Sequence, residues 1–332
     1  MHFKKPDVSD LEPAHKRLLE KSKIAVVVPC FNEEKNLGVV VNTVPDYVDH
    51  IVLVDDKSTD RTLALAKEMS VSNPKIVVLE LPENEGVGGA IAAGYEWCRD
   101  NQMHAAAVMA GDAQMDPQEL PLLLVPVLNK SANYTKGNRL LYKEAFNLIP
   151  RVRFFGNSLL SLLTKFASGY WSISDTQCGY TVADINVLNS IDWQKMYKRY
   201  GQPNDLLISL NINNFVVKDI IVRPVYNVGE KSGIKISRVI FTISRVILTG
   251  AIKRLYWKYV VKDFHPLILF FAFGMLMLLI GFMFLAHVVF GFFDGGSVPN
   301  VSLICALFSF GTAFNSLFFS MWLDMVEGRN LN

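Results

Sequence analysis

Charged residues are missing from two long stretches near the end of this sequence. Leu267–Phe293 contains no Asp, Glu, Lys or Arg, and Val298–Leu323 contains none either. A helix of about 20 apolar residues is long enough to cross a bilayer, so each stretch predicts a membrane span. A buried hairpin in a soluble core is the alternative, but uncharged runs of this length are rare in such cores. With the short Gly-rich segment DGGSV between them, the two stretches predict a transmembrane hairpin.

Cysteine is scarce, and neither sign of charge is in large excess. The 332 residues include 4 cysteines, and none of them forms a C-x-x-C pair, which argues against a disulfide framework or a zinc site. A net charge of +2 argues against a nucleic-acid partner held by overall charge. The polar N-terminus lacks the apolar run of a signal peptide. We therefore expect the soluble part to stay in the cytoplasm.

Two common phosphate-binding patterns are absent as well. The glycine-rich stretch NEGVGG matches neither G-x-G-x-x-G nor a loop ending in G-K-S/T, which disfavours a dehydrogenase or a kinase. Its small residues would still let the backbone approach a ligand closely at the start of a helix, where anions are favoured.

The first 233 residues contain a regular alternation of strand and helix patterns. Apolar, β-branched runs predict strands at Lys23–Cys30, His50–Asp56, Lys75–Leu81 and His104–Asp112. Helical segments between them complete an α/β pattern, which predicts a doubly wound, mostly parallel sheet. Ligands of such sheets bind at the carboxyl ends of the strands. The polar stretches CFNEE, DDKSTD, NEGVGG and GDAQMDP each follow a strand, so we expect them to form one site.

The segment before the first span is basic and has apolar residues at helical spacing. The apolar positions are Ile236, Val239, Ile240, Ile243, Val246 and Ile247. This pattern predicts an amphipathic helix at the membrane interface, and a helix packed on the soluble domain is the alternative. Four basic residues, Lys253, Arg254, Lys258 and Lys262, precede the first span, whereas the loop between the spans has none. The positive-inside rule therefore places both termini in the cytoplasm.

These patterns set the expected boundaries along the chain. We expect a polar extension (1–22), a large α/β domain (23–233), juxtamembrane helices (234–264), a hairpin (265–325) with spans at about 267–293 and 298–323, and a tail (326–332). The protein would then be a multi-pass plasma-membrane protein with its large domain in the cytoplasm. Gly274 and Gly281 in the first span are small enough for close helix packing, which leaves a homo-oligomer open.

The polar motifs resemble those of a known family. In order, VVVPCFNEE, IVLVDDKSTDRT, NEGVGGAIAAGY, GDAQMDP and DTQCGY are similar to motifs of the family-two glycosyltransferases, which have the GT-A fold. The resemblance covers about Ile24 to Lys235 and is closest to the polyprenyl-phosphate glycosyltransferases, the group of dolichol-phosphate mannose synthase. It implies inverting transfer of a sugar from a nucleotide sugar to a polyprenyl monophosphate. We favour a UDP-linked hexose as donor over a GDP-linked one.

The resemblance also implies roles for individual residues. On the donor side, the nucleotide sugar is expected at Pro29, Asn32, Glu33, Asp56, Gly86 and Asp112. Asp112 and Gln114 match the ligands of a Mg²⁺ or Mn²⁺ ion. On the acceptor side, Arg139, Arg153 and Lys231 match residues that bind the acceptor phosphate. Asp112, Arg153 and Asp175 are the expected catalytic residues, with Asp175 near the reacting centre.

One position departs from the family pattern. The first acid of the family's D-x-D motif is replaced here by Ala110, which weakens metal binding by two carboxylates. Mg²⁺ often needs only one or two protein carboxylates beside substrate phosphates, so Asp112 and Gln114 remain a workable set of ligands. Because the acceptor is already an anion, we expect no strong general base.

Three acids near these motifs are interpreted separately. We expect Asp116 to be a helix N-cap and Glu119 to face solvent, while Asp205 is either a second acid near the acceptor or a helix cap. A transferase that extends a lipid-linked glycan is an alternative function, although the chain lacks the Q-x-x-R-W element of processive synthases. A non-enzymatic membrane scaffold is the other alternative, but it would not need Asp56, Asp112, Arg153 and Asp175 together.

Overall fold

The computed structural model describes residues 12–225, 236–293 and 300–331 of the chain. The chain separates into two compact units, one reaching Ala251 and including Leu331–Asn332, and the other spanning Ile252–Asn330. Lys231 and the segment between the expected membrane spans lie outside the described residues.

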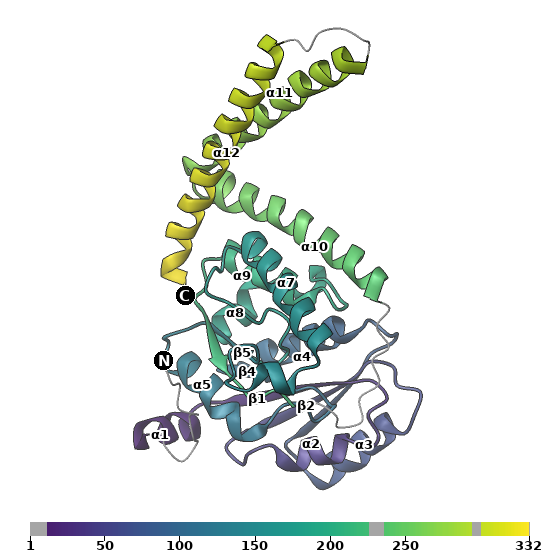
Figure 1. Cartoon of the computed structure of the whole chain (residues 1–332). Helices are drawn as coiled ribbons and strands as arrows, with labels where there is room; N and C mark the ends of the chain where they lie inside the picture. Colours follow the sequence, from purple (N-terminus) through teal and green to yellow (C-terminus); the bar gives the residue numbers. More distant parts are fainter. Residues whose placement is uncertain (1–11, 226–235, 294–299, 332) are drawn as a thin grey trace. The chain divides into compact units, whose positions relative to one another are not determined.

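The first unit is built on a seven-stranded sheet (Figure 1). Its strands are β1 (Ile24–Cys30), β2 (His50–Asp55), β3 (Ile76–Glu80), β4 (Ala105–Val108), β5 (Tyr134–Asn138), β6 (Thr181–Asp184) and β7 (Val217–Ile221). They lie in the order β3-β2-β1-β4-β6-β5-β7. Every pairing is parallel except those of β6, which is antiparallel to both β4 and β5. The predicted mostly parallel α/β sheet is confirmed.

Helices cover both faces of this sheet. They are α1 (Pro13–Lys21), α2 (Leu37–Thr43), α3 (Thr62–Ser72), α4 (Val87–Asp100), α5 (Leu120–Leu128), α6 (Ala145–Leu148), α7 (Arg151–Ser168), α8 (Ile185–Ser190) and α9 (Gln202–Ile212). One core lies between the sheet and α4, α8 and α9, and the other lies against α1, α2, α3 and α5. All seven residues of β1 are buried, as its uninterrupted apolar run predicts for a central strand.

The reversed direction of β6 matters for the site. The carboxyl ends of β1, β2, β4 and β5 share one edge of the sheet, because these strands are parallel. An antiparallel strand brings its beginning, not its end, to that edge. The DTQCGY loop (175–180) directly precedes β6, so it joins the loops that follow the parallel strands.

The helix before the first expected span, α10 (Ile236–Tyr256), belongs to the first unit as far as Ala251 and packs on its other helices through its middle part. Ile243 and Ile247 are buried against Ala167 of α7 and Ile208 of α9. The structure thus shows these two isoleucines packed on the protein, which was the alternative prediction, and not at a membrane interface. Leu248 on the same helix is exposed, and placement of that side at a membrane surface stays a prediction.

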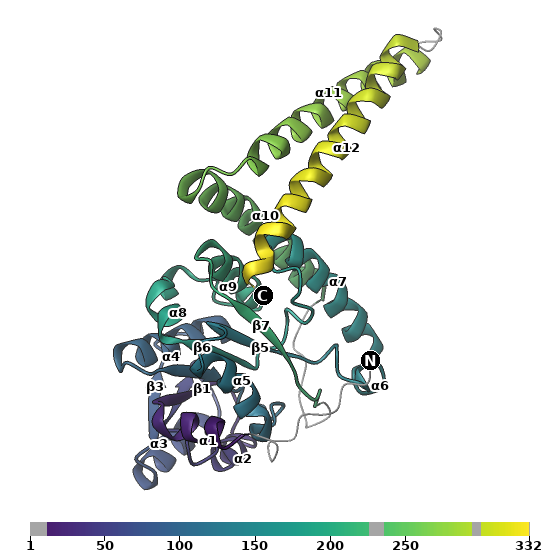
Figure 2. The same ribbon diagram turned by 90° about the vertical axis from the view of Figure 1, so that its left-hand side faces the viewer.

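The second unit contains α11 (Leu267–Phe293) and α12 (Asn300–Gly328), which lie side by side (Figures 1 and 2). A Cβ on Gly274 would meet Leu317 at 2.7 Å, and one on Gly281 would meet Phe310 at 3.0 Å. In the structure, these glycines therefore allow close packing between α11 and α12. A homo-oligomer stays a prediction. Both helices are long and apolar enough to cross a membrane by length and composition.

Candidate active site

Three strand ends are joined by hydrogen bonds at the edge of the sheet. The backbone N–H of Asp56 donates to the carbonyl of Cys30 at 2.9 Å, and Gly111 N–H donates to the carbonyl of Pro29 at 3.3 Å. The Asn32 side chain accepts from the backbone N–H of Thr59 at 2.8 Å. The loops after β1, β2 and β4 are thus held together, as the sequence predicts for one site.

Asp56 binds the start of the glycine-rich loop. Its two carboxylate oxygens accept from the backbone N–H groups of Glu85 (2.7 Å) and Gly86 (2.9 Å). Burial raises the pKa of Asp56, while these two hydrogen bonds and the charge of Arg199 act in the opposite direction. The side chain expected to contact the base therefore also fixes the loop that leads into α4.

The glycines of this loop make close contacts with the protein itself. A Cβ on Gly88 would lie 2.7 Å from the carbonyl of Tyr197, and one on Gly86, which has a φ of +86°, would lie 2.9 Å from that of Lys198. Gly94 approaches Val27 of β1 in the same way, at 2.2 Å. Packing thus explains these glycines without a ligand, and nucleotide binding at Gly86 stays a prediction.

Asp112 lies on a tight turn after β4. Its carboxylate accepts from the backbone N–H of Gln114 at 3.1 Å, and the intervening Ala113 has a φ of +58°. Glu33 lies close to this turn, because a Cβ on Gly111 would meet its Cγ at 3.3 Å. Burial, and the nearby charge of Asp112 to a smaller degree, raise the pKa of Glu33, while its hydrogen bond from Asn36 lowers it.

This set of side chains is suited to a divalent cation that is coordinated by the protein and by a bound substrate together. Asp112 would supply a carboxylate and Gln114 an amide oxygen, and Glu33, which lies close to the same turn, would offer a second carboxylate since Ala110 has none. Among the described residues, no group of three or more His, Cys, Asp or Glu side chains is placed to hold a metal ion alone. Mg²⁺ typically combines one or two carboxylates with phosphate oxygens, so the fit depends on a diphosphate.

Arg139 and Asp175 form an ion pair in which both carboxylate oxygens accept hydrogen bonds. Arg139 Nε and Nη2 donate to the two oxygens of Asp175 at 2.8 and 3.2 Å, and its backbone N–H adds a third bond at 3.1 Å. Asp175 is fully buried, which by itself would raise its pKa, but Arg139 and Lys136 outweigh this and hold the pKa below its usual range. Asp175 is therefore ionised at neutral pH and orients the Arg139 guanidinium.

Arg153 lies in the first turn of α7, a helix tied to the same loop. Further along α7, Ser161 Oγ accepts from the backbone N–H of Thr176 at 3.1 Å. Gln177 donates to Asn204 of α9 at 2.9 Å, and Thr164 of α7 donates to the same oxygen at 2.8 Å. These bonds fix α7 to the segment that carries Asp175, although they do not place the Arg153 guanidinium itself.

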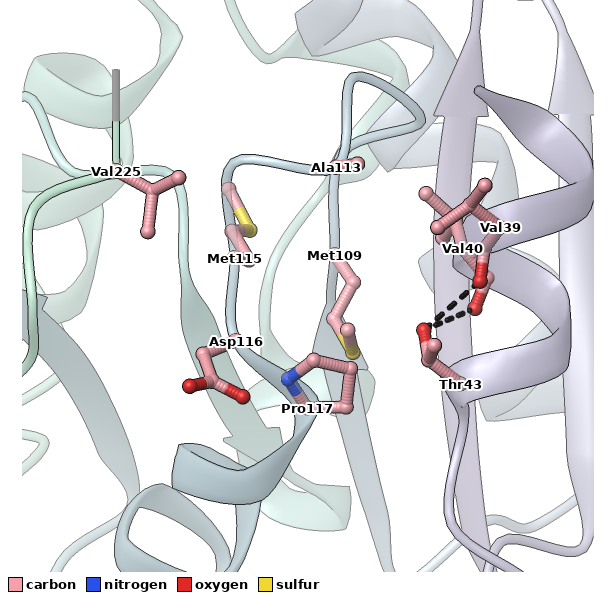
Figure 3. A pocket seen from close by; sticks show the side chains of 9 residues that line it. All are labelled: Val39, Val40, Thr43, Met109, Ala113, Met115, Asp116, Pro117 and Val225. Atoms are coloured by element: carbon pink, nitrogen blue, oxygen red, sulfur yellow. Dashed lines mark hydrogen bonds between the residues drawn. The ribbon is translucent and has the colours of Figure 1, made fainter. Parts of the chain in front are cut away.

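A small apolar cavity of about 220 Å³ lies beside the Asp112 turn (Figure 3). Its lining residues are Val39, Val40, Thr43, Met109, Ala113, Met115, Asp116, Pro117 and Val225. Most of these side chains are apolar, which does not suit a diphosphate. This cavity therefore gives no support for a donor site, and donor binding at Asp112 and Glu33 stays a prediction.

The three nearby acids have different outcomes. Asp116 accepts from the backbone N–H of Gln118 at 2.9 Å, which confirms the N-cap. The prediction for Glu119 is wrong, because it is buried and both of its oxygens accept from Arg223 N–H at 3.1 Å. Asp205 binds the backbone N–H of Tyr197 at 2.9 Å and so holds the segment beside the glycine-rich loop.

That segment also contains two basic residues near the site that no sequence motif marks. Lys198 forms an ion pair with Glu85 at 2.7 Å, and Arg199 is near enough to lower the pKa of Asp56. The only signal was a short basic run, KMYKRYG, in a region without a recognised motif. Contact with the glycine-rich loop arises from the fold and not from local sequence.

Comparison with known proteins finds relatives that cover most of the first unit. The chain is 27% identical to the UDP-N-acetylglucosamine–dolichyl-phosphate N-acetylglucosaminyltransferase of Methanococcus voltae, over 61% of this chain and 86% of that protein. It is 28% identical to the polyprenol monophosphomannose synthase of Mycolicibacterium smegmatis, over 69% and 88% of the two chains.

The fold has solved counterparts as well. Glucosyl-3-phosphoglycerate synthase from Mycobacterium tuberculosis, in complex with Mn²⁺, UDP and glucosyl-3-phosphoglycerate, matches with a TM-score of 0.53 and 18% identity, over 76% of this chain and 86% of that one. This likeness shows the GT-A type of fold. The family model for Glycosyl transferase family 2 matches residues 25–200, and the chain belongs to that family.

Proposed function

We propose that the protein is a membrane-anchored, inverting glycosyltransferase that moves a hexose from a UDP-sugar to polyprenyl monophosphate at the cytoplasmic face. The proposal rests above all on α7, which begins with Arg151 and Arg153 and leaves apolar side chains in solvent. A phosphate bound at such a helix start would have its hydrocarbon chain beside an apolar surface.

The exposed residues of α7 form a continuous stripe along the helix. They are Val152, Phe155, Leu159, Leu162, Leu163 and Phe166, hereafter the α7 stripe. They recur every three or four residues, apart from the adjacent pair Leu162 and Leu163, and this spacing puts them on one side of the helix. Soluble proteins seldom leave such a long apolar face uncovered, and a lipid surface or a lipid tail would cover it.

The names of two relatives support the same acceptor, and one of them supports a uridine donor. The printed names of the two relatives include a dolichyl phosphate and a polyprenol monophosphate. The first name also gives UDP-N-acetylglucosamine as donor. If the apolar helices α11 and α12 span the membrane, they would anchor the domain at the membrane surface, where the phosphate of the lipid lies. The basic residues before α11 favour a cytoplasmic domain.

The chemistry then needs positioning and charge more than proton transfer. An oxygen of the acceptor phosphate attacks the anomeric carbon of the sugar, and the bond from that carbon to the diphosphate breaks with inversion. Arg139, held by Asp175, and Arg153 would orient the attacking phosphate. Asp112, Gln114 and Glu33 would hold a divalent cation, which supplies positive charge for the departing diphosphate.

The α7 stripe offers a direct test with the full-length protein. Leu159, 62% exposed, is changed to Gln, and the exposed Val71 of α3 is changed to Gln as a matched control. Loss of a buried leucine in the bound state, about 1.5–3 kcal/mol, should raise the KM for polyprenyl phosphate in vesicles about tenfold or more. Transfer to a water-soluble short-chain prenyl phosphate should not change.

The control variant Val71→Gln should match the wild type with both acceptors. Equal loss with the long and the short acceptor would contradict a role for the α7 stripe in lipid binding, as would an unchanged KM for the long one.

A further inference from the structure

Asp219 lies on the edge strand β7, next to the pair formed by Arg139 and Asp175. Its carboxylate oxygen Oδ2 accepts from the side-chain amide of Asn138 at 2.5 Å and from the backbone N–H of Ser174 at 2.7 Å. Asn138 is the residue before Arg139, and Ser174 is the residue before Asp175. One oxygen of a distant strand thus contacts the neighbours of both members of the ion pair.

Asn138 extends this contact into the turn after β5. The residue is fully buried, and its own oxygen accepts from the backbone N–H of Leu141 at 3.1 Å. Arg139 therefore lies in a turn closed at one side by Asn138, whose amide is in turn fixed by Asp219. On the other side, Asp175 directly follows Ser174, whose backbone N–H donates to Asp219.

Asp219 lies among buried and charged groups that act on its pKa in both directions. Burial raises its pKa to about 6; the bonds from Ser174 and Asn138 and the charge of Lys136 act against the rise, whereas Asp175 adds to it. Lys136 pairs with Asp219 in strand register and is buried, with its ammonium donating to the carbonyl of Cys178. The charge of the carboxylate is thus partly balanced inside the fold.

The second oxygen of Asp219 marks this arrangement as unusual. Oδ1 is shielded from solvent and has no hydrogen-bond partner among the described residues. Buried carboxylate oxygens normally find a partner, and a neutral apolar side chain would avoid the cost of leaving one unpaired. All the hydrogen bonds that Asp219 accepts thus fall on its other oxygen, and they come from the residues before Arg139 and Asp175.

We propose that Asp219 is a positioning residue for sugar transfer: it sets the separation and orientation of Arg139 and Asp175 by holding Asn138 and Ser174 on one oxygen. This inference rests on the proposed function. Asp219 acts through other residues and need not contact either substrate. Its loss should loosen the Arg139 guanidinium and so lower the rate of the transfer step, without weakening the donor nucleotide.

The test uses the full-length protein with UDP-hexose and polyprenyl phosphate. Asp219→Ala should lower kcat at least tenfold and leave the Kd for UDP within twofold of the wild-type value. Asp219→Asn keeps an oxygen that can accept both bonds, so it should recover most of the lost kcat. This rescue separates positioning by hydrogen bonds from a need for the charge itself.

Asp49→Ala provides the matched control. Asp49 accepts a backbone N–H, that of Ile24, at 2.8 Å, but it does so at the beginning of β1, the opposite edge of the sheet. Its loss should lower the melting temperature without changing kcat. If Asp219→Ala folds with wild-type kcat, or if Asp219→Ala and Asp49→Ala lower kcat equally, the positioning role is refuted.

The same assay separates this inference from the proposed function. Should the wild-type protein transfer no sugar to polyprenyl phosphate with any donor, the proposed function itself fails. If Asp219→Ala fails to fold, the test uses the kcat values of Asp219→Asn and Asp219→Glu instead. Wild-type kcat in both of these variants would overturn the proposal. A loss in Asp219→Glu, which displaces the oxygen, together with near-normal Asp219→Asn would support it.

Discussion

At the scale of single residues, the carboxylates of the site bind the protein's own backbone. Asp56 holds two N–H groups of the glycine-rich loop, and Asp112 closes its own turn. Asp175 accepts three bonds from Arg139. These contacts give the loops a fixed form before any substrate arrives, which is the preorganisation that electrostatic catalysis requires.

The donor and acceptor sides can be separated by two substitutions. Asp56→Ala removes the bonds to Glu85 and Gly86, and a charge-assisted hydrogen bond contributes about 1.5–3 kcal/mol. Nucleotide affinity should therefore fall at least about tenfold. Arg153→Lys loses the paired hydrogen bonds that arginine makes with phosphate, so it should raise the KM for polyprenyl phosphate or lower kcat while nucleotide binding stays nearly unchanged.

Calorimetric titration of UDP against both variants checks this assignment. Equal loss of nucleotide affinity in the two variants would move Arg153 to the donor side.

Sequence patterns located the acids but not their partners. Asp56 and Asp112 follow apolar strand runs, and strand ends of a parallel sheet must meet at one edge, so their clustering was predictable. The burial of Glu119 was not predictable, because its partner Arg223 lies 104 residues away in sequence. Asp219 lies in VKDII, a run that no motif marks, and only the pairing of β5 with β7 brings it to Arg139.

At the scale of elements, the predicted strands agree with β1 to β4 to within a few residues. Runs of valine, isoleucine and alanine predict buried strands well. Strand direction was harder to predict: nothing in TVAD indicates that β6 is antiparallel. The contacts of Ile243 and Ile247 show a similar limit, since an apolar helix face looks the same whether it covers a protein or a bilayer.

A buried ion pair holds the second unit together near the end of α12. Arg254 donates to both oxygens of Asp324 at 2.6 and 3.1 Å, and the hydroxyl of Tyr259 donates to one of them at 2.5 Å. Arg254 is only 2% exposed. The bond joins the last turns of α10 to the last turns of α12 and so closes the helical unit.

Removal of one partner should destabilise this unit. Asp324→Ala removes the carboxylate that balances the charge of a buried arginine, and breaking a buried ion pair typically costs about 3–5 kcal/mol, so the melting temperature of the detergent-solubilised protein should fall clearly. The exposed pair of Asp192 with Lys195 is the control, and Asp192→Ala should change little. The same small change in both variants would show that the buried pair contributes no more than a surface one.

At the scale of the whole molecule, a family-two glycosyltransferase domain is joined to two long apolar helices. The proposed function explains this combination, because a polyprenyl phosphate exposes its reacting group at the membrane surface while a nucleotide sugar is soluble. The sequence predicted both parts from composition and motifs. It did not predict the sugar, since no motif in the chain is specific for one.

The central claim is tested most directly by sugar transfer in sealed inverted vesicles that contain the full-length protein and polyprenyl phosphate. A panel of radiolabelled UDP- and GDP-sugars, which do not cross the bilayer, is added outside, and labelled lipid is extracted. The account predicts polyprenyl-phosphate-dependent labelling with a UDP-hexose. Excess EDTA and Asp112→Asn should remove most of it, and added Mg²⁺ or Mn²⁺ should restore it to the wild-type protein. Full labelling in excess EDTA would contradict the role of the metal, and no labelled lipid with any donor would contradict the account as a whole.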